Sequence, residues 1–215
     1  GAATAAPAAA AFSFAAFAIG HNVGLSFLSG GAIRYRAYSL AGLSASRIAL
    51  LVGFIPLTFG LGAAILLGIT LLVDPAALTV LPVGTIWLQL LGVCLLMAPV
   101  AYIVWNMRAQ QPLQLGSWFL QPPGPRTGVA QCLLGSMDLV AASSVLFILL
   151  HASAGVSFLP FLGAYLLAMV AGLISNVPGA VGVFESAMLL LLPDVPVAVL
   201  LGSILAYRLI YYLIP

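Results

Sequence analysis

The sequence predicts an all-α integral membrane protein, a polytopic helical bundle with about six spans and two broken or re-entrant segments. Hydrophobic residues make up 64% of the 215 residues, and charged residues only 5%. Soluble domains carry about 25% charged residues, which excludes that class. Several apolar runs also reach the roughly 20 residues that a helix needs to cross the hydrocarbon core.

Six apolar runs are interpreted as the spans, and turn residues or polar residues separate them. They cover residues 5–29, about 47–73, about 84–107, 126–151, about 157–175 and about 196–215. Trp87 and Trp105 lie near the two ends of the third run, as interface anchors do. Residues 108–125 are rich in Pro, which predicts a polar connection outside the membrane core.

The distribution of arginine predicts the orientation of the spans. All but one of the six basic residues lie in two connections, and they are Arg34, Arg36, Arg47, Arg108 and Arg126. Connections rich in Lys and Arg tend to stay in the cytoplasm. We therefore expect 30–47 and 108–125 to be cytoplasmic, with 74–83 and 152–156 outside.

Several function classes are excluded by what the sequence lacks. The six arginines are dispersed and no Lys is present, so no basic patch for nucleic acid forms. Cys94 and Cys132 are too few for a disulfide framework or a metal site. No catalytic motif is found, so we expect no cofactor and no metal, and any catalysis outside this region. The termini suggest a piece of a longer protein.

The segment 176–185, between the last two spans, cannot continue a straight helix. Pro178 lacks a backbone donor, and Gly179 and Gly182 weaken helix further. A broken segment at membrane depth is tolerated only against protein or a water-filled cavity, and transporters often build binding sites there. A simple loop or kink between two spans is the alternative. Asn176, which opens the segment, is a secondary candidate.

A second glycine-broken stretch follows the first span. Gly30 and Gly31 precede Arg34 and Arg36, much as Gly179 precedes an acid in the later break. This resemblance between the two breaks is a weak internal repeat of the kind found in transporters. The candidate half-repeats cover 5–107 and 126–215, and either a parallel or an inverted relation is open.

Five charged residues are candidates for binding a charged ligand, each with a structural alternative. They are Arg34, Arg36, Asp138, Glu185 and Arg208. The first two could converge on a phosphate or merely set topology. Glu185 could accept an ammonium group, pair with an arginine or cap the following helix, and these roles are compatible.

Asp138 lies near the middle of the fourth span, where a carboxylate costs on the order of 3 kcal/mol. It is expected either to pair with Arg208 or to contact a ligand. Tyr207 could belong to an aromatic belt or line a headgroup path, and the belt is favoured. His21 and Asn22 could contact a ligand or form helix-end hydrogen bonds.

Four separated motifs resemble one known family. They are HNVG at 21–24, SGGAIRYRAYSLAGLS at 29–44, NVPGAVGVFE at 176–185 and AYRLIYY at 206–212. In this order and register, from about residue 12 to 213, they resemble the membrane region of bacterial aminoacyl-phosphatidylglycerol synthase/flippases, the multiple peptide resistance factor family. One departure is Gly179-Ala180, where the family usually has two glycines. Ala180 should be tolerated unless its position needs a positive φ.

The resemblance implies a bacterial inner-membrane, multi-pass protein in two parts. A C-terminal synthase domain would transfer Lys or Ala from aminoacyl-tRNA to phosphatidylglycerol. The membrane region, the part matched here, would then translocate the aminoacylated lipid to the outer leaflet and confer resistance to cationic antimicrobial peptides. The implied partners are these phospholipids and the chain's own synthase domain, and a homodimer is left open.

The residues suggest how such a path could work. Arg34 or Arg36 would hold the lipid phosphate, Glu185 or Asp138 would meet the amino group, and Arg208 would also line the path. The alternative is a membrane anchor that presents phosphatidylglycerol to the synthase without flipping it. A small-solute transporter would explain the broken helices but not the four motifs.

Overall fold

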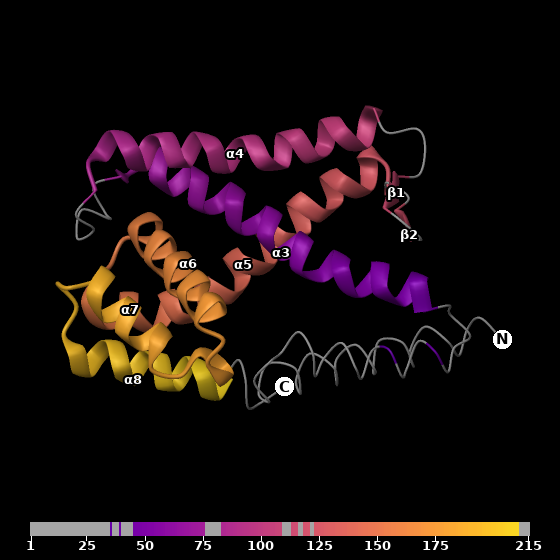
Figure 1. The fold of residues 1–215 in the computed structure, drawn as a ribbon. Coiled ribbons are helices and arrows are strands. Elements are labelled where there is room, and N and C mark those ends of the chain that lie inside the picture. Colours follow the sequence, from indigo (N-terminus) through magenta and orange to yellow (C-terminus); the bar gives the residue numbers. More distant parts are fainter. Residues whose placement is uncertain are drawn as a thin grey trace.

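The computed structural model describes residues 45–75, 83–108, 113–115, 118–120 and 123–210, together with the single residues Tyr35 and Ser39. Its helices are α3 (Ala45–Val73), α4 (Thr85–Arg108), α5 (Pro125–Ala154), α6 (Phe158–Ser175), the short 3-10 helix η2 (Pro178–Ala180), α7 (Val183–Leu191) and α8 (Val197–Arg208) (Figure 1). The predicted all-α polytopic class is confirmed. Six predicted site residues lie outside the described part of the chain: His21, Asn22, Gly30, Gly31, Arg34 and Arg36.

Four described helices are long and apolar enough to cross a bilayer. The qualifying segments are Leu51–Val73, Thr85–Arg108, Pro125–Ala154 and Phe158–Ser175, and they coincide with the second to fifth predicted spans. The first predicted span lies outside the described residues. Of the sixth, the structure describes α8, which has 12 residues and is shorter than a span.

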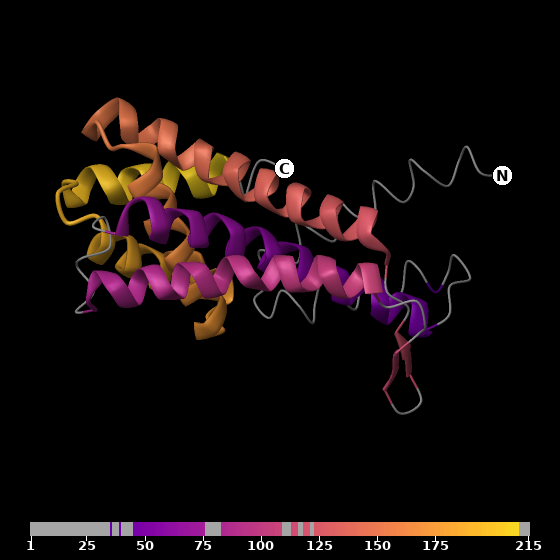
Figure 2. The same cartoon turned by 90° about the horizontal axis from the view of Figure 1, so that it is seen from above.

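The connection between α4 and α5 contains a short hairpin that the sequence analysis did not predict. Its strands are β1 (Leu113–Leu115) and β2 (Trp118–Leu120), which pair antiparallel with Leu113 opposite Leu120. In Figure 2 the hairpin projects from one end of the helices. Its position outside the helical body agrees with the predicted loop.

The three long helices α3, α4 and α5 pack against one another through small residues. A Cβ atom built on Gly62 of α3 would overlap the backbone of Gly135 in α5, and one built on Gly135 would overlap the carbonyl oxygen of Thr58. Lipid tails are as apolar as the helices, so the hydrophobic effect does not drive membrane helices together. Close approach at small residues stabilises their association through van der Waals contact instead. The two glycines therefore fix where α3 and α5 cross.

A chain of polar side chains joins the same three helices. The hydroxyl of Tyr102 in α4 donates to Gln131 Oε1 at 2.7 Å, and Gln131 Nε2 donates to the Thr58 hydroxyl at 3.2 Å. Thr58 in turn donates to the carbonyl oxygen of Phe54 at 2.7 Å. With no water in the hydrocarbon core, these groups must satisfy one another, so they also fix the helices in register.

Helices α6, α7 and α8 gather beside one half of the long helices (Figures 1 and 2). Helix α6 packs on α3 and α7, and α8 packs on α5 and α7. Fully buried side chains fill the space between them, among them Phe161, Tyr165, Met188, Leu200 and Ile204.

Helix α7 is the short helix that follows the predicted break. It has nine residues and therefore rises only about 14 Å, less than half of the roughly 30 Å that a span must cross. The chain leaves α6 at Ser175, reverses through η2, and continues as α7. Helix α8 then returns, and its last residue, Arg208, lies beside the start of α7.

Candidate functional site

The reversal after α6 is built from residues with positive φ. Asn176, the first residue after the helix, has φ 53°, Gly179 has φ 60° and Gly182 has φ 84°. Glycine adopts this region without the penalty that a Cβ imposes, and Asn tolerates it better than most residues. Pro178 opens the short η2 turn, closed by a 2.9 Å bond from the Ala180 N–H to the Val177 carbonyl. Pro178, Gly179 and Gly182, three of the five predicted broken-helix residues, thus lie in this turn.

Ala180 also has a positive φ, of 50°. Alanine was expected to be tolerated here unless the position needs a positive φ, and the position does have one. The left-handed conformation costs about 1 kcal/mol for a residue with a Cβ. Its methyl group packs against α6, because a Cβ built on Gly172 would lie only 2.6 Å from it. Gly172 therefore makes room for the side chain of Ala180.

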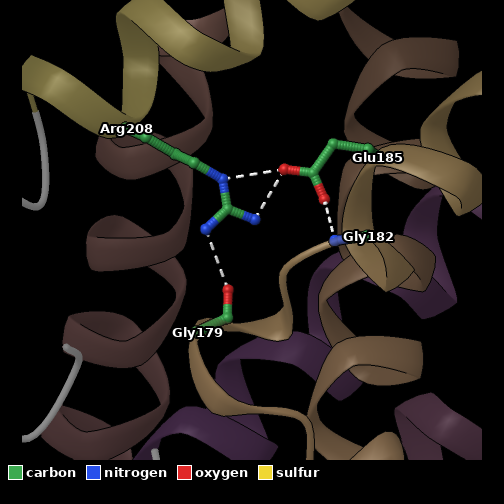
Figure 3. Close-up of polar contacts among 4 residues, drawn as sticks. All are labelled: Gly179, Gly182, Glu185 and Arg208. Carbon is green, nitrogen blue, oxygen red and sulfur yellow. Dashed lines mark hydrogen bonds and ion pairs between the residues drawn. The ribbon is translucent and has the colours of Figure 1, made fainter. Parts of the chain in front are cut away.

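The centre of the site is an ion pair between Glu185 of α7 and Arg208 of α8 (Figure 3). Arg208 Nη2 lies 2.7 Å from Glu185 Oε1, and Arg208 Nε donates to the same oxygen at 2.8 Å. Arg208 Nη1 donates to the carbonyl oxygen of Gly179 at 2.9 Å. One guanidinium thus links the end of α8 to both the turn and α7, and all three of its nitrogens donate.

The other oxygen of Glu185 caps its own helix. Oε2 accepts the backbone N–H of Gly182 at 2.7 Å, and Glu185 is the third residue of α7. A carboxylate in the first helical turn also complements the helix dipole. The capping role and the pairing with an arginine, both left open by the sequence, therefore occur together.

The two side chains are mostly withdrawn from solvent but not sealed. Arg208 is 21% exposed and Glu185 is 19% exposed. Buried ion pairs are stabilised only when geometry and further hydrogen bonds offset desolvation, and both partners here have those bonds.

A buried aromatic cluster lies behind the ion pair. The hydroxyls of Tyr165 in α6 and Tyr207 in α8 are 2.8 Å apart, and the two residues are 1% and 2% exposed. The Tyr165 ring also meets the Phe184 ring edge to face, with centroids 5.7 Å apart. The favoured prediction that Tyr207 belongs to an aromatic belt at the membrane surface is therefore wrong.

Sequence reasoning missed Tyr165 altogether. It is the one hydroxyl in an otherwise apolar run of α6 from Phe158 to Gly172. A buried tyrosine hydroxyl usually has a hydrogen-bond partner, and that signal could have pointed to a second polar group nearby.

Asp138 is not joined to this site. It is exposed on α5, and within the described residues it has neither an ion pair nor a hydrogen bond to Arg208 or to another side chain. The expected alternative of an Asp138–Arg208 pair is replaced by Glu185–Arg208. Of the predicted residues, the structure brings together Gly179, Gly182, Glu185 and Arg208.

The chain is similar in sequence to two longer bacterial proteins. No protein-family model matches the chain. The uncharacterized protein slr0712 of Synechocystis sp. is 41% identical over 212 residues, which cover 94% of this chain and 63% of that protein. The inner membrane protein YbhN of Escherichia coli is 31% identical over 209 residues, covering 90% of this chain and 62% of YbhN.

A shorter match links the chain to a lipid-modifying enzyme. Phosphatidylglycerol lysyltransferase of Staphylococcus haemolyticus is 33% identical over 91 residues, covering 41% of this chain but 11% of the enzyme. A lysyltransferase of Staphylococcus epidermidis matches at 34% over 92 residues.

The matches to slr0712 and YbhN cover nearly all of this chain but less than two thirds of either relative. The lysyltransferase match supports the resemblance inferred from the motifs over part of the chain, and with it a role related to membrane lipids.

Proposed function

We propose that this region translocates aminoacylated phosphatidylglycerol, in its lysyl or alanyl form, from the inner to the outer leaflet. The protein is a multi-pass protein of the bacterial inner membrane, supported by its four span-length helices and by its similarity to YbhN. The partial match to phosphatidylglycerol lysyltransferases supports the choice of lipid. The observation that carries the proposal is the Glu185–Arg208 pair at the broken helix.

The pair offers one anion and one cation at hydrogen-bonding distance from each other. An aminoacylated phosphatidylglycerol headgroup carries a phosphate together with one ammonium group in the alanyl form and two in the lysyl form, so it offers a partner of opposite charge to each protein group. Guanidinium binds phosphate oxygens in a bidentate manner, and a carboxylate accepts an ammonium donor. A headgroup can therefore replace the internal pair and keep both protein charges neutralised.

The bonding pattern indicates which partner moves. The Nε and Nη2 donors of Arg208 face Glu185 Oε1, so a phosphate that takes this pair of donors in a bidentate manner displaces the carboxylate oxygen. Glu185 stays anchored through Oε2 to the Gly182 N–H, which leaves Oε1 for the ammonium group. Arg208 thus exchanges acceptors while Glu185 remains in place.

Other predicted roles extend this proposal. Arg34 and Arg36 would hold the phosphate elsewhere on the path, and exposed Asp138 would meet the amino group at another position along α5. His21, Asn22 and Asn176 are secondary contacts in the same proposal.

The whole protein's partners belong to the proposal as well. In the arrangement implied by the lysyltransferases, a C-terminal domain of the same chain would make the lipid from aminoacyl-tRNA, and export would confer resistance to cationic peptides. The alternative is an anchor that presents phosphatidylglycerol to that domain. Both functions involve a synthase domain, so the two are separated by experiment.

The decisive experiment separates synthesis from movement. Cells that make aminoacyl-phosphatidylglycerol are given the full-length parent, the parent lacking this region, or Glu185→Gln, and an impermeant amine label reports outer-leaflet lipid. We expect unchanged total lipid with a fall of about tenfold or more in labelled lipid, since a neutral amide would replace the carboxylate proposed to accept the ammonium group.

The region-deletion arm distinguishes the two functions. If total and labelled lipid fall together, the region is a substrate-presenting anchor. If labelled lipid is normal in Glu185→Gln, the role given to this carboxylate is wrong.

A further inference from the structure

The aromatic cluster behind the ion pair sits in a position to control it. Phe184 immediately precedes Glu185 in α7, and Tyr207 immediately precedes Arg208 in α8. Tyr165 of α6 contacts both rings, at centroid distances of 5.7 Å and 6.3 Å. One side chain therefore touches the neighbour of each charged residue.

Helix geometry turns this adjacency into a constraint. Successive side chains on an α-helix point about 100° apart, because there are 3.6 residues per turn. When Phe184 and Tyr207 are fixed against Tyr165, the rotation of α7 and α8 about their axes is fixed as well. The directions of the Glu185 and Arg208 side chains follow from that rotation.

The hydroxyl pair adds specificity that ring packing alone lacks. The oxygens of Tyr165 and Tyr207 lie 2.8 Å apart in a region where neither residue is more than 2% exposed. A buried hydroxyl without a partner is unfavourable, so rotation of α8 that separates the two oxygens is opposed. The Tyr165 ring also contacts the Phe161 ring one turn earlier in α6, which restrains its orientation.

We propose that Tyr165 is a positioning residue for the Glu185–Arg208 site, acting through Phe184 and through its hydroxyl bond to Tyr207. The inference rests on the proposed function for its consequence in lipid transport. The coupling between the Tyr165–Tyr207 hydroxyl pair and the Glu185–Arg208 ion pair does not depend on that function and can be tested without it.

The first test compares two tyrosines that undergo the same chemical change. Tyr165→Phe keeps the ring and removes the hydroxyl bond to Tyr207. Tyr102→Phe removes a similar bond, to Gln131 at 2.7 Å, on helices away from the broken segment. At equal amounts of folded full-length protein, we expect Tyr165→Phe to lower labelled outer-leaflet lipid about threefold, the equivalent of a typical hydrogen bond between membrane helices. Tyr102→Phe should stay near wild type.

Either of two results overturns the proposal in this arm. One is wild-type transport in Tyr165→Phe, and the other is an equal loss in both variants, which would indicate general loosening of the bundle.

The second test needs no transport. Thermal unfolding in detergent is measured for the parent, Tyr165→Phe, Glu185→Gln and the double variant. If Tyr165 acts through the ion pair, the double variant loses less stability than the sum of the single losses, as coupled residues do. Additive losses would refute the coupling. If the parent moves no lipid, the proposed function fails while this cycle still decides the positioning role.

Discussion

At the scale of single residues, Ala180 is the clearest case of a local conflict. Its φ of 50° belongs to the region that favours glycine, and its neighbour Gly179 already occupies that region at 60°. The family that the motifs resemble usually has glycine at both positions. The sequence indicated the departure, but only the backbone shows that it carries strain.

We therefore expect Ala180→Gly to stabilise the protein by up to about 0.5 kcal/mol, because relief of the left-handed strain is partly offset by the added freedom of the unfolded chain. Thermal unfolding of the purified protein in detergent checks this. Ala187→Gly, in the interior of α7, is the matched control and should destabilise the protein by about 1 kcal/mol. A lower melting temperature for Ala180→Gly would show that its methyl contact with Gly172 outweighs the strain.

The partner of Arg208 was also beyond sequence reasoning. Both Asp138 and Glu185 were available acids, and 23 residues separate Glu185 from Arg208 along the chain. What brings them together is the reversal after α6 and the short return of α7. The hydrophobic periodicity of the sequence does not reveal how α7 and α8 pack, and therefore does not reveal which acid lies beside Arg208.

At the scale of elements, the helices themselves were largely predictable. The second to fifth spans agree with α3, α4, α5 and α6 to within a few residues, because long apolar runs with Gly or Pro at their ends leave little choice. The hairpin was missed because each of its strands has three residues, too few for an alternating pattern. A helix that Glu185 could cap was expected after the break, and α7 is that helix.

The crossing of α3 and α5 gives a prediction at this scale. Gly135→Ala places a methyl group against the Thr58 carbonyl, so the helices must separate, and we expect a loss of about 1–3 kcal/mol. Gly60→Ala, on α3 with nothing within 4 Å of the added carbon, is the control and should be neutral or stabilising. Unfolding in detergent reports both, and equal behaviour would rule out the tight crossing.

At the scale of the whole molecule, the arginine distribution predicts orientation. The connection holding β1 and β2 should be cytoplasmic, and the one between α5 and α6 should be outside. In a background with Cys94 and Cys132 replaced by Ala, we expect Ser153→Cys to react with an impermeant maleimide in intact cells. Gln114→Cys should react only after permeabilisation. The reverse labelling pattern would contradict the predicted orientation of the spans.

The predicted half-repeats at 5–107 and 126–215 stay a prediction. Their comparison depends on the glycine-broken stretch near Gly30 and Gly31, which lies outside the described residues. The second break shows what an equivalent would require: a turn of positive-φ residues, a short returning helix and a cation to bind its carboxylate.

The short length of α7 has a consequence for the energetics of moving a charged headgroup. A charge crossing intact hydrocarbon meets a barrier that extends through roughly 30 Å of low-dielectric material. In the proposed translocation, a turn bearing a carboxylate and a guanidinium, followed by a helix of only about 14 Å, would replace part of that slab with fixed polar groups. The proposal then implies that the length of α7 sets the hydrophobic distance left for a headgroup to travel, so lengthening α7 by one turn would change the crossing rate without altering either charge.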